Sequence, residues 1–288
     1  MSGRRVLVTG SSGQLGGEIC RQLAAAGHQV VGLDRVAGPA TTVPGDVADR
    51  ALMAELVARV DAVVHSASLH APHVATHSRA DFIATNVTGT LALLELAAAA
   101  GHRRFVYTST TSVFGNAMVP RDAAVWVTEE LEPEPRDIYD LSKLSAEALC
   151  RLIAAESRMA VTILRTSRFY DEGPERVAIH RLHRGGDVRD IAAAHLLALG
   201  REAPGCELFI VSGRSPFRPS DTAELLRDAR AVIRRRLPDA EAWFARRGWA
   251  LPDRIDRVYD IDRAERVLGY RPRFDFTSLF AGDGSLMP

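Results

Sequence analysis

Two short segments carry side chains whose types and spacing suit proton transfer. Tyr139 and Lys143 are four residues apart, so in a helix they lie on one face, one turn from each other. A free phenol has a pKa of about ten and is a poor base at neutral pH, but a neighbouring ammonium group favours the phenolate. Thirty residues before Tyr139, the run Ser109–Ser112 consists of four consecutive hydroxyl residues. Taken alone, the pair also fits a helix surface, and the hydroxyl run also fits a polar turn.

The start of the chain predicts a strand, a tight turn and a helix that would hold a nucleotide. The β-prone residues Val6–Thr9 lead into Gly10, and glycines recur at Gly13 and Gly16 before an apolar pattern at helical spacing. In such a turn Gly10 allows the bend, Gly13 lets the backbone approach a pyrophosphate, and Gly16 lets helix and strand pack closely. Because the free amides and the dipole of the helix end face the anion, we predict a dinucleotide site here.

Asp34 is predicted to select the dinucleotide. It ends the second predicted strand, which covers 28–33, and lies 18 residues beyond Gly16. A carboxylate at this place accepts hydrogen bonds from both ribose hydroxyls of NAD and repels the extra phosphate of NADP, so we favour NAD over NADP. Arg35 follows directly, and it would either stack on the adenine or attract a 2′-phosphate.

The third and fourth predicted strands end in polar or small residues suited to the same cofactor. Asp46 follows a weak third strand, where a carboxylate accepts the adenine amino group or caps the next helix, and both alternatives stay open. Asp49 is the expected cap of a helix over 50–59. The fourth strand, Asp61–His65, is followed by the small residues 66–68, which leave room for a cofactor.

Histidines at and after this strand raise the question of a metal site. His65 fits a packed strand end. His70, His73 and His77 have helical spacings that suit metal ligation. Pro72 interrupts a continuous helix, however, and no nearby Cys, Asp or Glu completes a ligand set. We therefore expect no metal here, and instead a loop that borders the substrate cavity.

Two helices and one further strand complete the predicted nucleotide-binding part. An apolar helix covers 86–100 and stops at Gly101, and its apolar surface extends over more than one face. Such a helix is either deeply buried or covered by a second subunit. A strand over Arg104–Thr108 leads into the hydroxyl run, and a helix over 139–157 carries the Tyr-x-x-x-Lys pair.

As a set, these motifs resemble the short-chain dehydrogenase/reductase superfamily, and more closely its extended branch of NAD-dependent epimerases and dehydratases. The matching elements lie between Val6 and Ala198. They are Gly10, Gly13, Gly16, Asp34, the Asp46-Val47 pair, Asn86-Val87-x-Gly-Thr, Ser109-Thr110, Val113-Phe114-Gly115 and Tyr139-x-x-x-Lys143, with Leu268-Gly269-Tyr270-Arg271-Pro272 near the end of the chain.

The resemblance implies an α/β fold, a doubly wound parallel sheet (Rossmann) with a small C-terminal substrate lobe. Residues 1–165 are expected to form the dinucleotide-binding Rossmann domain. Residues 166–288 would mainly form the small lobe, with later strands and helices returning to the first domain. The aromatic residues Trp243, Phe244 and Trp249 are expected to close this lobe over its core.

The resemblance also assigns roles to single residues. In the family the tyrosine is the acid/base, the lysine also binds the nicotinamide ribose, and a Ser or Thr orients the substrate carbinol. These roles fall on Tyr139, Lys143 and Thr110, with Ser109 directly before it. The implied cofactor contacts are Gly10, Gly13, Gln14, Leu15, Gly16, Asp34, Arg35, Asp46, Val47, Ala67, Ser68, Asn86 and Lys143. The implied substrate contacts are Thr111, Arg168 and His70.

Two positions depart from relatives of known chemistry. Dehydratases of the family carry an Asp-Glu pair after the catalytic threonine, whereas this chain has Thr111 and Ser112, which cannot supply the acid and the base. Sugar-nucleotide epimerases usually carry a phosphate-contacting asparagine where this chain has Arg168. That arginine would bind a phosphate or a carboxylate, or else pair with Asp171 or Glu172.

The segment after this position is short. Family members that act on nucleotide sugars commonly have a long insertion before the next helix, but this chain soon reaches Asp187, and Asp190 is expected as the helix N-cap. A small lid suggests a smaller substrate, such as a free sugar acid, or a nucleotide pocket assembled differently. Uronate dehydrogenases resemble the chain in this shortness.

Composition excludes several partners. Lys+Arg and Asp+Glu are both 36, so no overall charge attracts nucleic acid. The arginines of 227–236 fit the solvated face of a continuous helix over 221–236 that Ser220 caps.

No apolar run suggests a membrane partner, and three dispersed cysteines suggest buried thiols in a reducing, cytoplasmic compartment. The resemblance implies a homodimer through the helices 86–100 and 139–157.

Three functions remain open from the sequence. The first is an NDP-sugar epimerase similar to UDP-glucose 4-epimerase, which oxidises a sugar carbinol transiently and returns the hydride to the other face. The second is a net NAD-dependent dehydrogenase of a small polyol, uronate or other alcohol. The third is a non-enzymatic dinucleotide sensor, and retention of Tyr139 and Lys143 speaks against it. Family frequency gives the epimerase a slight preference.

Overall fold

The computed structural model describes residues 3–170, 172–202 and 204–281. The chain forms two compact units, each built from separate stretches of sequence. The first comprises Met1–Val113, Pro135–Arg165 and Ala192–Phe209, and the second comprises Phe114–Glu134, Thr166–Ile191 and Ile210–Pro288. The expected boundary near residue 166 is therefore only one of several crossings, and the sequence pattern gave no sign that 114–134 belongs with the second unit.

A parallel seven-stranded sheet forms the frame of the fold, in the order β3-β2-β1-β4-β5-β7-β8. Its strands are β1 (Arg5–Thr9), β2 (Gln29–Asp34), β3 (Val43–Pro44), β4 (Ala62–His65), β5 (Arg104–Thr110), β7 (Ala160–Thr166) and β8 (Gly205–Val211). Strand β1 pairs in parallel with both β2 and β4, so the strand order reverses beside it. In open parallel sheets, ligands bind at the carboxyl ends of the strands where the order reverses, which in this sheet is at the ends of β1 and β4.

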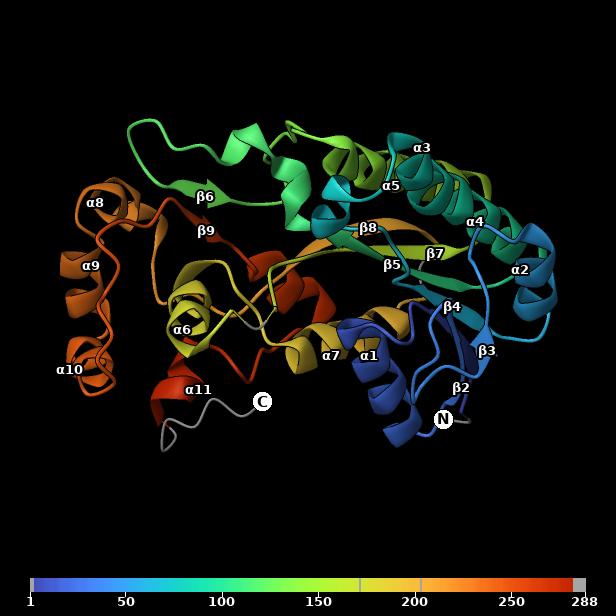
Figure 1. The fold of residues 1–288 in the computed structure, drawn as a ribbon, viewed down its shortest axis with the longest axis horizontal. Helices are drawn as coiled ribbons and strands as arrows, with labels where there is room; N and C mark the ends of the chain where they lie inside the picture. Colours follow the sequence, from blue (N-terminus) through green and yellow to red (C-terminus); the bar gives the residue numbers. More distant parts are fainter. Residues whose placement is uncertain (1–2, 171, 203, 282–288) are drawn as a thin grey trace. The chain divides into compact units, whose positions relative to one another are not determined.

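Helices cover both faces of the sheet in the first unit (Figure 1). They include α1 (Gln14–Ala25), α2 (Arg50–Val57), α4 (Gly89–Ala99), α5 (Ile138–Glu156) and α7 (Val188–Leu199), of which the first residues of α7 lie in the second unit. Helix α4 packs between α2 and α5. The core includes Leu7, Val63, Leu93, Phe105 and Ile153, which are all buried. The doubly wound α/β architecture predicted from the sequence is confirmed.

One helical run is long and apolar enough, by length and composition, to cross a membrane. It covers Arg79–Ala99 and consists of α3 (Arg79–Phe82), the π-helical segment η2 (Ile83–Thr88) and α4. Leu93 and Leu94 of this run are fully buried in the sheet's core. The run packs against α2 and α5 and so belongs to the core of the first unit.

The second unit has its own core. A parallel pair, β6 (Val125–Val127) with β9 (Arg257–Tyr259), packs near the helices α6 (Pro174–His183), α8 (Thr222–Arg227), α9 (Ala229–Arg236), α10 (Ala240–Ala245) and α11 (Phe276–Ala281). Trp243 and Phe244 are buried in this core, and Trp249 packs against it, as the sequence predicted. Short helical segments are η1 (Ala71–Ala75), η3 (Thr111–Phe114), η4 (Asn116–Met118), η5 (Pro219–Asp221) and η6 (Ala264–Leu268).

The arginine-rich segment is not one helix. Asp228 divides α8 from α9 and caps α9 by accepting a hydrogen bond from the Ala231 amide at 3.1 Å, so the expected Ser220 cap of a continuous helix is wrong. The arginines form ion pairs with nearby acids. These pairs are Arg230–Asp253, Arg234–Glu241, Arg235–Glu224 and Arg236–Asp221. Paired arginines at a surface fit the predicted solvated face and not a nucleic-acid surface.

Asp190 does not cap α7, which corrects the expectation. It lies inside the first turn, where its carboxylate accepts the amides of Arg273 and Phe274 at 2.9 and 2.8 Å. Asp187, directly before the helix, accepts the Arg189 amide at 3.0 Å and takes the capping place. The buried Asp190 carboxylate therefore holds the C-terminal segment to the helix, and burial raises its pKa.

Candidate active site

The turn after β1 has the geometry of a dinucleotide cradle. Gly10 has φ 77°, and a Cβ added to it would lie 2.8 Å from the amide nitrogen of Ala67. A Cβ on Gly16 would lie 1.9 Å from the Gly10 carbonyl oxygen, so this position also requires glycine. At Gly13 an added Cβ meets only that same oxygen, at 3.3 Å, and the backbone is otherwise open. No side chain caps α1, so its first amides remain for an anion such as a pyrophosphate.

Asp34 is held at the end of β2 by backbone amides. Its two carboxylate oxygens accept the amides of Ser12 and Val36, each at 3.0 Å. Each oxygen keeps a free lone pair, so the carboxylate can still accept ribose hydroxyls. The neighbouring Arg35 lies 3.7 Å from Asp46. The Asp46 carboxylate accepts the Ala48 amide ahead of α2, and Asp49 is the N-cap of that helix, so the capping role considered for Asp46 is wrong and its contact with the adenine stays a prediction.

The other residues expected at the cofactor differ in exposure. Asp49 caps α2 through the amides of Ala51 and Leu52, as predicted. Gln14 is exposed at the start of α1, whereas Leu15 is buried. Val47 is buried in the core beside Gly89, so only its backbone is placed to meet a ligand.

Replacing Asp34 with asparagine tests the cofactor preference. We expect NAD affinity to fall roughly tenfold, because a charge-assisted acceptor is lost, while NADP affinity stays equal or rises. Titration calorimetry with both dinucleotides measures this change. The control is Asp253→Asn, which alters an exposed acid in the second unit. Equal weakening of NAD and NADP binding would argue against a selective role for Asp34.

Tyr139 and Lys143 lie on the buried side of α5. The helix begins at Ile138, and Tyr139 is only 8 % exposed and packs against Leu69 and Phe82. The Lys143 Nζ donates a hydrogen bond to the carbonyl oxygen of Thr108 at 2.6 Å, at the end of β5. Both side chains of the pair are therefore buried on the side of α5 that faces the sheet, and not on its solvent-exposed side.

Lys143 is the only lysine in a chain whose other basic side chains, apart from histidine, are all arginines. Its Nζ lies 4.2 Å from the centre of the Tyr107 ring. Burial lowers the pKa of Lys143 to about 7, although the charge of Glu147 opposes this shift. Arginine cannot lose its proton in this range, so lysine is the basic residue that can hold or release a proton here.

The lowered pKa of Lys143 makes stability depend on pH. Between pH 7 and the ordinary lysine pKa of 10.5, the unfolded chain keeps a proton that the native side chain has released, so stability rises with pH in this window. Relative to Lys143→Met, the wild-type free energy of unfolding should rise by about 2 kcal/mol from pH 7 to 9. Urea unfolding measures the difference, and NMR of 13C-labelled lysine reads the pKa of this single side chain. Parallel pH curves for the two proteins would contradict the prediction.

The hydroxyls at the end of β5 have different surroundings. Thr110 Oγ1 accepts the Ser112 amide at 3.1 Å, and Thr110 is only partly buried. Ser109 points to the other side of the strand, where its hydroxyl donates to Glu147 at 2.6 Å. Its hydroxyl is thus bound to a buried carboxylate, and the catalytic role expected for Ser109 stays a prediction. Thr111 begins η3 and is buried.

Glu147 is a site residue that sequence reasoning missed. Its fully buried carboxylate receives two hydrogen bonds from the Arg165 guanidinium, at 2.9 and 2.7 Å, besides the bond from Ser109. Arg151 lies 3.3 Å away. A signal was present, because Glu147 follows Lys143 by one helical turn and places an acid on a buried helix face.

Asn86 was expected to contact the cofactor, but its side chain is fully occupied within the protein. Its Nδ2 donates to the Leu69 carbonyl and to the Ser142 hydroxyl at 2.8 and 2.9 Å. Its Oδ1 accepts the Leu69 amide at 2.8 Å and the Ser68 hydroxyl at 3.1 Å. Asn86 thus positions the 68–69 loop against α5, and it lies in a π-helical segment of the kind that often marks functional sites.

His65 is a packed strand-end residue, as predicted, and it belongs to a chain of buried hydrogen bonds. Its Nδ1 lies 2.7 Å from Thr9 Oγ1 and its Nε2 lies 2.9 Å from Thr90 Oγ1. Thr90 donates to the Asn86 carbonyl, and Thr9 accepts the Ala67 amide. These partners assign the proton to Nε2. Burial lowers the pKa of His65 to about 3, so the ring is neutral.

His70, His73 and His77 contact one another in the loop after β4. The His70 amide donates to His73 Nδ1 at 3.0 Å, across the start of η1. The ring centres of His70 and His73 are 4.3 Å apart, and those of His73 and His77 are 5.1 Å apart. Within the described ranges, no three His, Cys, Asp or Glu side chains are grouped as metal ligands.

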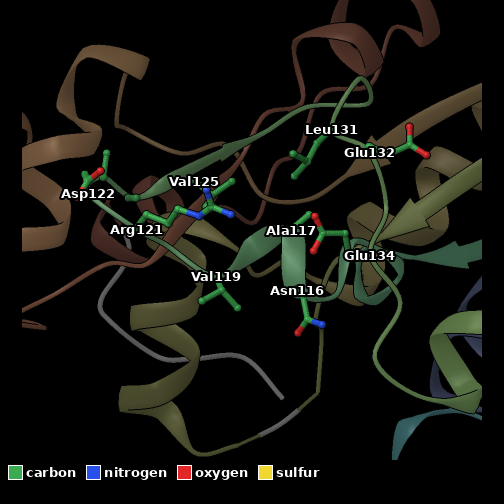
Figure 2. Close-up of a pocket in the computed structure, with 11 residues that line it drawn as sticks. Asn116, Ala117, Val119, Arg121, Asp122, Val125, Leu131, Glu132 and Glu134 are labelled. Atoms are coloured by element: carbon green, nitrogen blue, oxygen red, sulfur yellow. The ribbon is translucent and has the colours of Figure 1, made fainter.

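In the second unit, Arg168 forms an ion pair with Glu172, which is one of the alternatives left open by the sequence. The same unit has an open pocket of about 450 Å³, lined by residues of 116–134. Figure 2 shows Asn116 and Glu134 close together and Arg121 on the other side. The pocket contains none of the residues predicted to bind substrate.

Comparison with known proteins identifies the chain at the level of its family. The family model for the NAD dependent epimerase/dehydratase family matches residues 6–189, which include the glycine turn and the Tyr-x-x-x-Lys pair. The chain belongs to the NAD-dependent epimerase/dehydratase family. It is an enzyme of the short-chain dehydrogenase/reductase superfamily, and NAD is its cofactor.

The relatives of this family member are named for different activities. A 3-beta-hydroxysteroid dehydrogenase of Mycolicibacterium neoaurum is 28% identical over 94% of this chain and 87% of its own length. A UDP-glucose 4-epimerase of Klebsiella pneumoniae is 36% identical over 39% of this chain and 93% of its own. The solved UDP-glucose 4-epimerase of Thermotoga maritima with UDP-glucose has a TM-score of 0.70, with 20% identity and 95% of each chain covered.

Proposed function

We propose that the enzyme is an NDP-sugar epimerase similar to UDP-glucose 4-epimerase. The observation that carries the proposal is the placement of Tyr139 and Lys143 on the buried side of α5, with the lysine bound to the end of β5. Thr110 ends the same strand. The name of the Klebsiella relative supports this choice among the activities of the family.

Each of these residues has a defined task in the proposal. When bound, NAD accepts a hydride from the substrate carbon and returns it. Tyr139 takes the carbinol proton and gives it back, with Thr110 orienting the hydroxyl. Lys143 binds the nicotinamide ribose and stabilises the phenolate. Glu147 and Arg165 hold the buried side of α5 to the sheet.

A net dehydrogenase is the second candidate, and one feature of the fold favours it. Between β7, which ends at Thr166, and α7, which starts at Val188, the described chain has a single helix, α6. A segment this short leaves little chain for a nucleotide pocket. The steroid dehydrogenase that matches over most of this chain supports the same alternative.

One experiment separates the two candidates. The purified enzyme is assayed with UDP-glucose without added cofactor, and with hexuronates and simple alcohols plus free NAD. An epimerase interconverts UDP-glucose and UDP-galactose and forms no net NADH. Stoichiometric reduction of added NAD by an alcohol or uronate, without interconversion, would replace the epimerase proposal with the dehydrogenase.

We further propose a homodimer, formed through the helices expected over 86–100 and 139–157. Leu141 and Leu152 of α5 are 48% and 49% exposed, and Ile83 of η2 is 40% exposed. Large apolar side chains gathered at neighbouring helices are typical of subunit interfaces. Light scattering should give twice the 31.3 kDa chain mass, and Leu152→Glu should lower it.

A reducing, cytoplasmic location is proposed from the thiols. Cys20 and Cys150 are buried and Cys206 is partly buried, and all three are free. Burial raises the pKa of Cys20 to about 11, so this thiol stays protonated and unreactive.

A further inference from the structure

Arg184, at the C-terminal end of α6, is a half-buried cation that forms no ion pair with any carboxylate in the described part of the chain. Its Nε is buried and has no hydrogen-bond partner among the described residues. Its Nη2 donates one bond, to the neutral ring nitrogen Nε2 of His180 at 3.2 Å. Removing a guanidinium from water without a compensating negative charge is unfavourable, so this arrangement calls for an anion.

Comparison with other arginines shows that Arg184 is exceptional. Four arginines in the described part of the chain have a buried nitrogen without a hydrogen-bond partner. Three of them are neutralised by an acid: Arg104 by Glu202, Arg165 by Glu147, and Arg181 by Asp187. Arg184 has no such ion pair in the same ranges, so no described carboxylate neutralises it directly.

The acids near Arg184 already have partners. Glu172 pairs with Arg168, and its other oxygen lies 3.1 Å from His180 Nδ1. Asp256 receives two hydrogen bonds from Arg257, at 3.1 and 2.5 Å. Burial is the first cause that lowers the pKa of Arg184, and the charges of Arg257 and Arg168 lower it too, while the charge of Asp256 acts against them.

The neighbouring histidines add no compensating charge. Burial, and after it the Arg184 charge, lower the pKa of His180 to about 4 and that of His183 to about 3. Both rings are therefore neutral at pH 7. Among the described residues around Arg184, the cations Arg168, Arg184 and Arg257 then outnumber the carboxylates Glu172 and Asp256.

We propose that Arg184 binds an anionic oxygen group of the substrate, either a carboxylate or a phosphate. This inference rests on the proposed function, because it assigns the anion to a sugar acid or a sugar nucleotide. The site belongs wholly to the second unit, and Arg257 adds positive potential beside it. The backbone of Arg168 lies next to it, since the Arg168 carbonyl accepts the Gly186 amide at 2.9 Å.

Binding to the NAD-loaded enzyme tests the proposal. Titration calorimetry uses glucuronate, glucose 1-phosphate, UDP-glucose and uncharged glucose as probes. Arg184→Gln should weaken an anionic probe at least tenfold, and Arg184→Lys should restore part of the affinity. The matched control is Arg176→Gln, an exposed arginine of the same helix, which should change nothing. NAD affinity should be the same in all four proteins.

Thermal unfolding provides a second measurement. Its expected result differs from the result for an arginine with a purely structural role. Without ligand, Arg184→Gln should be as stable as the wild type or more so, because it removes an uncompensated charge. With the anionic probe, the wild type should gain stability and Arg184→Gln should not. A variant that unfolds more easily in both conditions would assign Arg184 a structural role and overturn the proposal.

The outcomes separate this inference from the proposed function. Arg184-dependent binding of glucuronate identifies a carboxylate, and Arg184-dependent binding of glucose 1-phosphate and UDP-glucose identifies a phosphate. If UDP-glucose is epimerised with unchanged KM by Arg184→Gln, the inference fails and the proposed function stands. If glucuronate binds through Arg184 but no sugar nucleotide is epimerised, the proposed function fails and the inference stands. Failure of every anionic probe to bind the wild type overturns the inference.

Discussion

Replacing Tyr139 with phenylalanine is expected to lower kcat by a factor of about 10³ while NAD affinity stays within about twofold. The variant loses the hydroxyl that takes the carbinol proton, but it keeps the ring that packs against Leu69 and Phe82. The glycine turn and Asp34, which are expected to bind the dinucleotide, lie elsewhere in the sheet and do not change. Steady-state kinetics and NAD titration of the same preparation measure both effects.

The control for Tyr139→Phe is Tyr170→Phe, which removes a hydroxyl from a side chain that is 43% exposed. It should leave kcat within about twofold, because surface hydroxyls contribute little. Loss of NAD affinity in parallel with kcat in Tyr139→Phe would mean that the phenol holds the cofactor and does not transfer the proton. Retained activity would show that another group acts as the acid/base.

Replacing Glu147 with leucine is expected to reduce the free energy of unfolding by about 3 to 5 kcal/mol. The change leaves the Arg165 guanidinium buried without its bidentate partner and removes the acceptor of the Ser109 hydroxyl. Few single substitutions approach this magnitude. The loss would be a large part of the total stability, since most domains are stable by only about 5–15 kcal/mol. Urea unfolding, followed by circular dichroism, gives the change.

A double substitution checks the cause of this loss. Glu147→Leu with Arg165→Met replaces the ion pair by apolar groups of similar volume, so part of the stability should return. The comparison is a double-mutant cycle that includes both single variants. Additive losses in the cycle would show that the two charges do not stabilise each other.

Local sequence patterns predicted much of the nucleotide-binding part of the fold. Gly16 needs glycine because of a contact with the Gly10 carbonyl in the same strand–turn–helix, and Gly10 itself has a positive φ of 77° in that turn. Asp49 caps a helix that begins at the next residue. Trp243 and Phe244 are neighbours in the core of the second unit. Such features depend on residues close in sequence, where spacing and residue type determine the conformation.

The remaining features depend on contacts between distant segments. Asp190 accepts amides more than 80 residues away, and no local pattern distinguishes this role from a helix cap. Asn86 is occupied by the 68–69 loop and by Ser142, a residue 56 positions later. Ser109 donates to Glu147, a residue 38 positions later whose carboxylate is held by Arg165 on β7. Which side of a strand a hydroxyl faces thus follows from packing that residue type alone does not determine.

The buried hydrogen bonds around His65 have a consequence for kinetics. The Ala67 amide, Thr9, His65, Thr90 and the Asn86 carbonyl form a relay in which every proton points the same way. Reversing one member would leave two donors or two acceptors facing each other, so the imidazole is confined to one tautomer. Because burial also lowers the pKa of this ring to about 3, it stays neutral near neutral pH. Any ionisation seen in the activity of this enzyme near neutral pH therefore belongs to another group, and Lys143 is the first to examine.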